Sequence, residues 1–235
     1  RDVERSRGLG DVYKRQTPGS SQNSITSLLK ADSIGCYGSE FDVWLTKDSK
    51  LVVNHDPVYK MRPMEYSKGD ALTGLKLSNG ENLPSLEQYL KVGKEHNTKL
   101  ILELKALNSK KRETKAVQEI LATVKKMGLE SRMEYITFSL HAMKEFIRLA
   151  PAGTPVFYLN GELSPKELKD LGAAGLDYHM GVIKKHPEWI KEAHDLGLKV
   201  NVWTVDKAED MKWLIDQKVD FITTNEPTVA QEILK

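Results

Sequence analysis

Apolar positions along the chain follow two different periods from Thr17 onward. Short runs rich in β-branched and aromatic residues are typical of strands, and longer segments with apolar residues every three or four positions are typical of helices. The strand-like runs are residues 39–46, 51–54, 99–104, 135–139, 156–159, 176–180, 199–203 and 221–223. The helix-like segments are residues 21–34, 84–96, 109–127, 141–149, 165–174, 187–196, 208–217 and 227–234.

The order of these segments predicts the fold. From residue 99 onward strands and helices alternate, which indicates parallel strands joined by crossover helices. When the two closely spaced runs 39–46 and 51–54 are counted as one barrel position, seven strands follow Thr17, and an eighth would complete a (β/α)8 TIM barrel of ordinary length. We expect the eighth before residue 17, so the first strand is atypical or missing. A doubly wound open sheet is the competing α/β architecture, but the chain has no glycine-rich dinucleotide-binding turn.

Two stretches depart from the alternation. Residues 1–16 are rich in charged side chains and have no lasting periodicity, so we expect an atypical segment, whose composition a foreign origin would explain. Residues 17–235 would then form the barrel domain. Residues 57–83 are broken by prolines and glycines, and we expect them to form a small insertion after the second strand.

Composition and charge exclude some classes of protein. The chain is 40% hydrophobic and 29% charged, with 35 basic and 33 acidic residues and a net charge of +2. These values predict a globular chain, and no basic stripe indicates nucleic-acid binding. Cys36 is the only cysteine, which excludes an internal disulfide and a cysteine-rich zinc site. The sequence has no transmembrane stretch, and its first residues lack the apolar core of a signal peptide.

Three acidic residues stand on two of the strand-like runs. Glu40 and Asp42 are two positions apart, so their side chains share one face of a strand, and Glu103 lies near the end of the next long run. Buried carboxylates need a cation or hydrogen-bond donors, and oxygen ligands suit Mg2+ or Ca2+. The alternative is that Glu40 points outward or pairs with Lys105.

Four other side chains could take part in chemistry. His55 lies where a strand opens into a loop and is either an acid–base group or an ordinary loop histidine. Lys105 could hold a phosphate oxygen or simply pair with Glu103. Trp203 ends a strand and could line a pocket or pack between barrel and helices. Among the remaining histidines, His179 is a weaker candidate that could point inward from a strand.

These residues lie in motifs that resemble the glycerophosphodiester phosphodiesterase family. The motifs are Gln22-Asn23, GSEFDV from Gly38, LTKD from Leu45, LVVNHD from Leu51, LELK from Leu102, VNVWTV from Val200 and TTNEP from Thr223. The resemblance covers nearly all of residues 17–235. It implies a metal-dependent TIM barrel that cleaves glycerophosphodiesters to glycerol 3-phosphate and an alcohol. The implied partner is this small-molecule substrate, with no nucleic acid and no protein partner.

The resemblance also implies a role for each candidate residue. A divalent cation, Mg2+ or Ca2+, would be held by three carboxylates: Glu40, Asp42 and Glu103. His55 would be one of two catalytic histidines, Lys105 would contact the phosphate and Trp203 would line the substrate pocket. Relatives that carry a leader peptide favour a periplasmic or secreted location.

Two departures from the family pattern affect the expected activity. The chain has Gln22-Asn23 where the family usually has Glu-Asn. The family's first strand carries His-Arg-Gly, which its usual spacing places near residues 11–13, but no histidine precedes His55. We therefore expect a hydrolase with this sequence to have impaired activity. The alternatives are a non-catalytic barrel that binds phosphodiesters or a metal, and a different metal-assisted hydrolase on the same fold.

Overall fold

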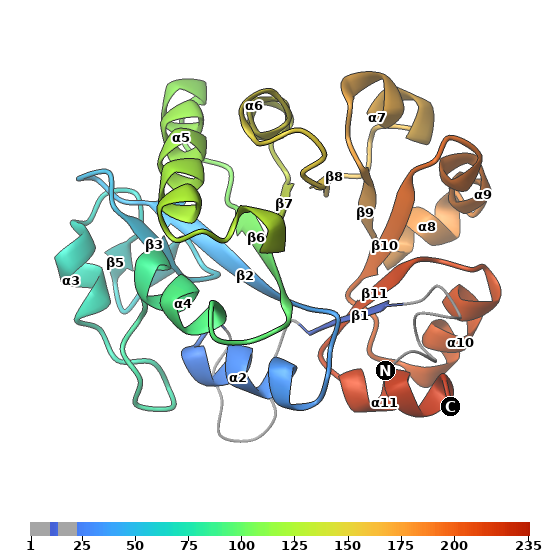
Figure 1. The fold of residues 1–235 in the computed structure, drawn as a ribbon, viewed down its shortest axis with the longest axis horizontal. Coiled ribbons are helices and arrows are strands. Elements are labelled where there is room, and N and C mark those ends of the chain that lie inside the picture. Colours follow the sequence, from blue (N-terminus) through green and yellow to red (C-terminus); the bar gives the residue numbers. More distant parts are fainter. Residues whose placement is uncertain (1–9, 14–22) are drawn as a thin grey trace.

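Eight parallel strands close into a ring in the computed structural model, which describes residues 10–13 and 23–235 (Figure 1). In ring order they are β1 (Gly10–Tyr13), β2 (Gly38–Leu45), β6 (Lys99–Leu104), β7 (Met133–Thr137), β8 (Val156–Tyr158), β9 (Gly175–His179), β10 (Lys199–Trp203) and β11 (Phe221–Thr224). The strand β11 pairs with β1, and β1 pairs with β2. The (β/α)8 barrel is thereby confirmed, with its first strand before residue 17 as expected.

Helices cover the outside of the ring (Figure 1). They are α2 (Ile25–Ser33), α4 (Leu86–Gly93), α5 (Lys110–Lys126), α6 (Leu140–Leu149), α7 (Pro165–Leu171), α8 (Met180–Lys185), α9 (Glu188–Asp195), α10 (Ala208–Asp216) and α11 (Pro227–Ile233). Several begin at a serine whose hydroxyl accepts a backbone N–H, and Ser109 and Ser139 do this for α5 and α6. Among the described residues, no helix has the length and apolar character needed to cross a membrane.

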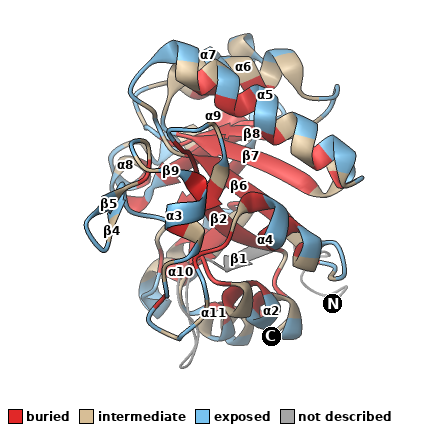
Figure 2. Cartoon of the chain, turned by 90° about the vertical axis from the view of Figure 1, so that its left-hand side faces the viewer, coloured by how far each residue is buried: buried red, intermediate tan, exposed pale blue. Residues whose placement is uncertain are grey.

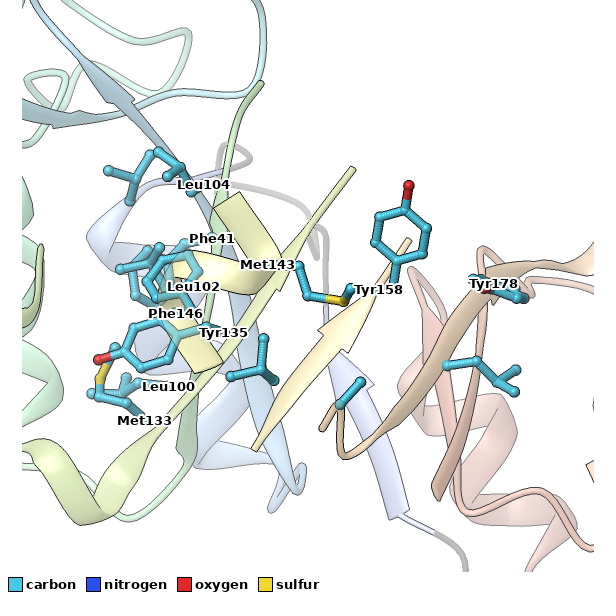
Figure 3. Close-up of a cluster of buried hydrophobic side chains, with 14 of the residues drawn as sticks. Phe41, Leu100, Leu102, Leu104, Met133, Tyr135, Met143, Phe146, Tyr158 and Tyr178 are labelled. Carbon is cyan, nitrogen blue, oxygen red and sulfur yellow. The ribbon is translucent and has the colours of Figure 1, made fainter. Parts of the chain in front are cut away.

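The main core lies between the outer faces of the strands and the helices, as Figure 3 shows for the neighbourhood of β6 and β7. Leu100, Leu102 and Leu104 alternate along β6 and are fully buried. The rings of Tyr135 on β7 and Phe146 on α6 stack with their centroids 4.5 Å apart. This apolar layer drives the helices onto the sheet, and it leaves the opposite face of each strand turned into the ring.

Residues 57–83 form an excursion beside β2. The strand β3 (Leu51–Val53) pairs antiparallel with β2, and β4 (Val58–Tyr59), β5 (Arg62–Pro63) and α3 (Gly69–Thr73) follow. A separate apolar cluster supports this part of the chain: Trp44, Val52, Met64, Leu72, Leu77 and Leu83. The side chain of Glu65 accepts hydrogen bonds from Asn108 N at 3.2 Å and Arg112 Nε at 3.3 Å. The excursion is therefore fastened to the start of α5, while β4 and β5 project from the surface (Figure 2).

One expected strand has other bounds in the structure, and one helix was not expected. The strand expected at residues 135–139 is β7 at Met133–Thr137, because Ser139 already caps α6 and ends the extended chain. The helix α8 was not expected. Its apolar residues continue directly from the apolar run of β9, so the pattern does not separate the end of the strand from the start of a short helix.

Glu134 is a buried carboxyl group inside the amino-terminal end of the ring. It lies on β7 and accepts a hydrogen bond of 2.6 Å from the hydroxyl of Tyr37. Burial raises the pKa of Glu134 above the ordinary 4.5, although the Tyr37 bond and Lys99 oppose the increase. The folded chain therefore holds this proton more tightly than the unfolded chain does.

We expect Glu134→Gln to flatten the dependence of stability on pH. A raised pKa stabilises the fold fully below the unfolded value, and this contribution is lost as pH rises through the folded pKa. Each unit of difference is worth about 1.4 kcal/mol. Urea unfolding between about pH 4.5 and 7.5 should show a loss of stability in the parent that is smaller in the variant, whose amide oxygen still accepts from Tyr37. Parallel pH curves would contradict this prediction.

Candidate active site

Four of the candidate residues share the inner face of the ring. Residues that pair across parallel strands point to the same side, and the register pairs Asp42 with Glu103 and His179 with Trp203. Following the register through β7 and β8 keeps both pairs on one face. Trp203 packs against the apolar cluster inside the ring that includes Ile136. All four paired residues stand toward the carboxyl ends of their strands, where the active sites of such barrels are found.

Three carboxylates meet on this inner face. Glu40 and Asp42 come from β2 and Glu103 comes from β6, and all three are buried. One oxygen from each of them lies within 4.8 Å of the others. The structure thus brings together the three residues expected as metal ligands, and Glu40 does not point outward.

Lys105 places its ammonium group against two of the three carboxylates. Its Nζ lies 3.1 Å from Oδ1 of Asp42 and 2.9 Å from Oε2 of Glu103. Burial would lower the pKa of Lys105, but Asp42 and Glu103 raise it above its ordinary value, so the side chain stays charged. The pairing with Glu103 considered from the sequence is therefore present, and Lys105 also contacts Asp42.

One ammonium group does not balance the three carboxylates. Burial, followed by repulsion from Asp42 and Glu40, raises the pKa of Glu103 well above 4.5, and Lys105 only partly offsets this. Excess negative charge in a buried place is costly. A set of carboxylate oxygens at this spacing fits a hard divalent cation such as Mg2+ or Ca2+, which would relieve the repulsion.

Asn23 orients Asp42 from a distant part of the sequence. Its Nδ2 donates to Oδ2 of Asp42 at 2.9 Å, and its Oδ1 accepts from the backbone N–H of Asp42 at 2.8 Å. Asn23 is buried and has a positive φ of 60°, a conformation that asparagine adopts more readily than most residues. In the sequence Asn23 stands within a motif, but its spacing to Asp42 does not indicate this role. Its neighbour Gln22 lies outside the described residues.

His55 stands at the rim beside the carboxylates, just after β3. The backbone N–H of Asn54 donates to the carbonyl of Asp42 at 2.9 Å, which ties this loop to β2. The His55 side chain is 44% exposed, and its Nδ1 lies 2.8 Å from Oδ1 of Asp56. The ring is therefore held by a carboxylate on one side and open to solvent on the other.

Three rings form an aromatic wall, by which we mean Phe138, His179 and Trp203. The Trp203 ring meets Phe138 edge-on with centroids 5.8 Å apart, and it meets His179 in the same way at 5.0 Å. The indole Nε1 of Trp203 donates to the carbonyl of Asp177 at 2.7 Å. Trp203 faces the inside of the ring, so the alternative of packing between barrel and helices is wrong. Phe138 was not expected in the site, because it lies in none of the motifs.

The strand β1 spans the positions where the family pattern has His-Arg-Gly. Its backbone pairs Val12 with both Gly38 and Thr223, so a first barrel strand is present with other residues in the motif. The rest of the expected atypical segment, residues 1–9 and 14–16, lies outside the described residues.

Comparison with known proteins agrees with this geometry. A family model described as the glycerophosphoryl diester phosphodiesterase family matches residues 7–229. A glycerophosphodiester phosphodiesterase of Caldanaerobacter subterraneus subsp. tengcongensis is 26% identical over 229 residues, covering 91% of this chain and 92% of that protein.

Two solved structures extend the comparison. A glycerophosphodiester phosphodiesterase from Parabacteroides distasonis is 49% identical, covers 97% of both chains and superposes with a TM-score of 0.95. An Oleispira antarctica phosphodiesterase, solved with the product sn-glycerol-3-phosphate, shares the fold at a TM-score of 0.80 and 19% identity, covering 95% of both chains. The chain therefore belongs to the glycerophosphodiester phosphodiesterase family of phosphoric diester hydrolases.

Proposed function

We propose that the chain hydrolyses glycerophosphodiesters to glycerol 3-phosphate and an alcohol with the help of Mg2+ or Ca2+. The observation that carries the proposal is the buried cluster of Glu40, Asp42 and Glu103 at the carboxyl end of the barrel, whose ligand oxygens lie within 4.8 Å of one another. A divalent cation held there would polarise a phosphoryl oxygen and offset its charge.

The other residues of the site supply binding and proton transfer in this proposal. Lys105 is charged and lies beside the cluster, so it can donate to a phosphate oxygen that approaches the carboxylates. Trp203 offers an apolar surface for the carbon atoms of the substrate. Asn23 keeps Asp42 in position through its two hydrogen bonds.

His55 is the proposed proton-transfer group. When its Nδ1–H donates to Asp56, its Nε2 carries the free lone pair and can take a proton from the attacking oxygen. That oxygen belongs either to water or to the glycerol hydroxyl next to the phosphate, and both need the same base. The leaving alkoxide needs a second group to protonate it. The family's first-strand histidine is the natural candidate, and its absence is why we propose that this chain is impaired as written.

The second candidate function is a barrel that binds phosphodiesters or a cation without hydrolysis. The lack of any histidine before His55 favours it. In this second function the carboxylates and Lys105 still form the binding site, and only the proton-transfer step is absent.

Release of glycerol 3-phosphate from glycerophosphocholine tests the proposal. The assay uses the whole chain with Mg2+, with Ca2+ and with EDTA, beside calorimetric titration of each cation. Hydrolysis that EDTA abolishes supports the phosphodiesterase. Cation binding with no release from a folded chain fits both the binding barrel and a hydrolase that lacks its first-strand histidine, and restoring that histidine decides between them. No cation binding at all would contradict the metal-assisted hydrolase and the cation-binding barrel, and would leave only a barrel that binds phosphodiesters without a cation.

A further inference from the structure

His179 faces the same space as the proposed active site and has had no role so far. It is the last residue of β9, on the inner face, and it pairs in register with Trp203. Its ring stands edge-on to Trp203 at 81°, and its side chain is exposed. Of the histidines, His55 and His179 both lie at this end of the strands. The ring of His179 is held in a different way from that of His55.

A backbone contact fixes the tautomer of His179. The N–H of Gly181 donates to its Nδ1 at 2.9 Å, so this nitrogen is an acceptor and the ring proton lies on Nε2. A side chain at Gly181 would come within 3.0 Å of this nitrogen, so the glycine lets the backbone approach the ring closely.

We propose that His179 contacts the substrate as a hydrogen-bond donor, through Nε2–H, to an oxygen of the bound glycerophosphate. This inference rests on the proposed function. The opposite arrangement holds at His55, where Asp56 lies against Nδ1. The free nitrogen of His55 is therefore placed as an acceptor, and that of His179 as a donor.

The chemistry of the substrate fits a donor in this position. A glycerophosphate offers phosphoryl and hydroxyl oxygens as hydrogen-bond acceptors. The carboxylate cluster on β2 and β6 offers only acceptors too, and Lys105 is the donor beside it. Donors that are already fixed before binding cost little reorganisation. His179 is fixed by Gly181 on one side and by the Trp203 ring on the other. It would thus complete a site in which His179 donates from the end of β9 and Lys105 donates from just beyond the end of β6.

The test separates the donor from the helix cap, because His179 also caps α8 through Nδ1. His179→Ala removes both functions. His179→Asn keeps an acceptor suited to a helix N-cap but has no donor at the reach of Nε2. His186→Ala is the matched control at the other end of α8, where His186 stacks on Trp189. Each protein is titrated calorimetrically with sn-glycerol 3-phosphate and with inorganic phosphate, in saturating Mg2+ or Ca2+.

We expect both substitutions at His179 to weaken binding of sn-glycerol 3-phosphate by about tenfold or more, with unchanged cation affinity and an unchanged His186→Ala control. An equal loss for inorganic phosphate identifies a phosphoryl oxygen as the acceptor, and a loss for glycerol 3-phosphate alone identifies a hydroxyl. Parent-like binding by His179→Asn would overturn the proposal, because the cap alone would then explain His179→Ala. Failure of the unaltered chain to bind glycerol 3-phosphate while it binds the cation would instead overturn the proposed function, and this inference with it.

Discussion

Replacing Glu103 with Gln should lower kcat/KM for glycerophosphocholine by at least about 100-fold and weaken cation binding by a similar factor. The substitution keeps the size of the side chain and removes the charge of one of the three proposed ligands. Without metal, the variant should be more stable than the parent, because Glu103 is buried beside Asp42 and Glu40 and its charge is repelled by theirs. With metal the order should reverse, since a cation at about 100 times its Kd stabilises the parent by about 2.7 kcal/mol.

Thermal unfolding with and without Mg2+ or Ca2+ measures both effects in one experiment. Glu134→Gln is the matched control, because it also neutralises a buried inward carboxyl group, but on β7 and beside Tyr37. That control should keep its cation-dependent shift in Tm. A Glu103→Gln protein that retained the full shift would remove Glu103 from the ligand set.

Restoring His-Arg-Gly at residues 11–13, by Asp11→His, Val12→Arg and Tyr13→Gly together, should raise kcat by about 10²- to 10⁴-fold. This is the range that a positioned proton-transfer group contributes. The strand that would carry the motif is present as β1, whose backbone pairs with β2 and β11. The measurement is release of glycerol 3-phosphate at saturating glycerophosphocholine.

Two controls accompany this triple variant. A version with Ala in place of the restored His should gain little in kcat, which separates proton transfer from the effects of Arg and Gly. Combining the triple variant with His55→Ala should abolish the gain, because both proton transfers are then needed. If the triple variant binds the cation and the phosphate but turns over no faster than the parent, a lost histidine does not explain the impairment.

The barrel and its carboxylate cluster follow from local pattern. Strand–helix alternation indicates parallel strands, and the two-residue spacing of Glu40 and Asp42 turns both inward together. The register then sets Asp42 against Glu103 on the next strand. The fold and the meeting of these carboxylates depend on periodicity and on the order of the elements, and both can be predicted from a single sequence.

The finer contacts depend on separations that no local pattern records. Asn23 reaches Asp42 across 19 positions from a backbone with positive φ. The link between Glu65 and Arg112 joins the excursion to α5 across 47 positions. At His179 the difficulty is local. The apolar run of β9 continues into α8, so the sequence pattern does not mark where the strand ends and the helix begins.

Because β1 closes the ring, removal of residues from the amino end of the chain would open the barrel. β1 is four residues long, and it meets β2 at Val12 and Tyr13 and β11 along Gly10–Tyr13. A chain trimmed to begin at Asn23 would leave β2 and β11 each with a free edge of backbone N–H and C=O groups. Open strand edges recruit other chains. Shortening this protein at its amino end should therefore produce self-association that grows with concentration, visible as a rise in apparent mass by light scattering.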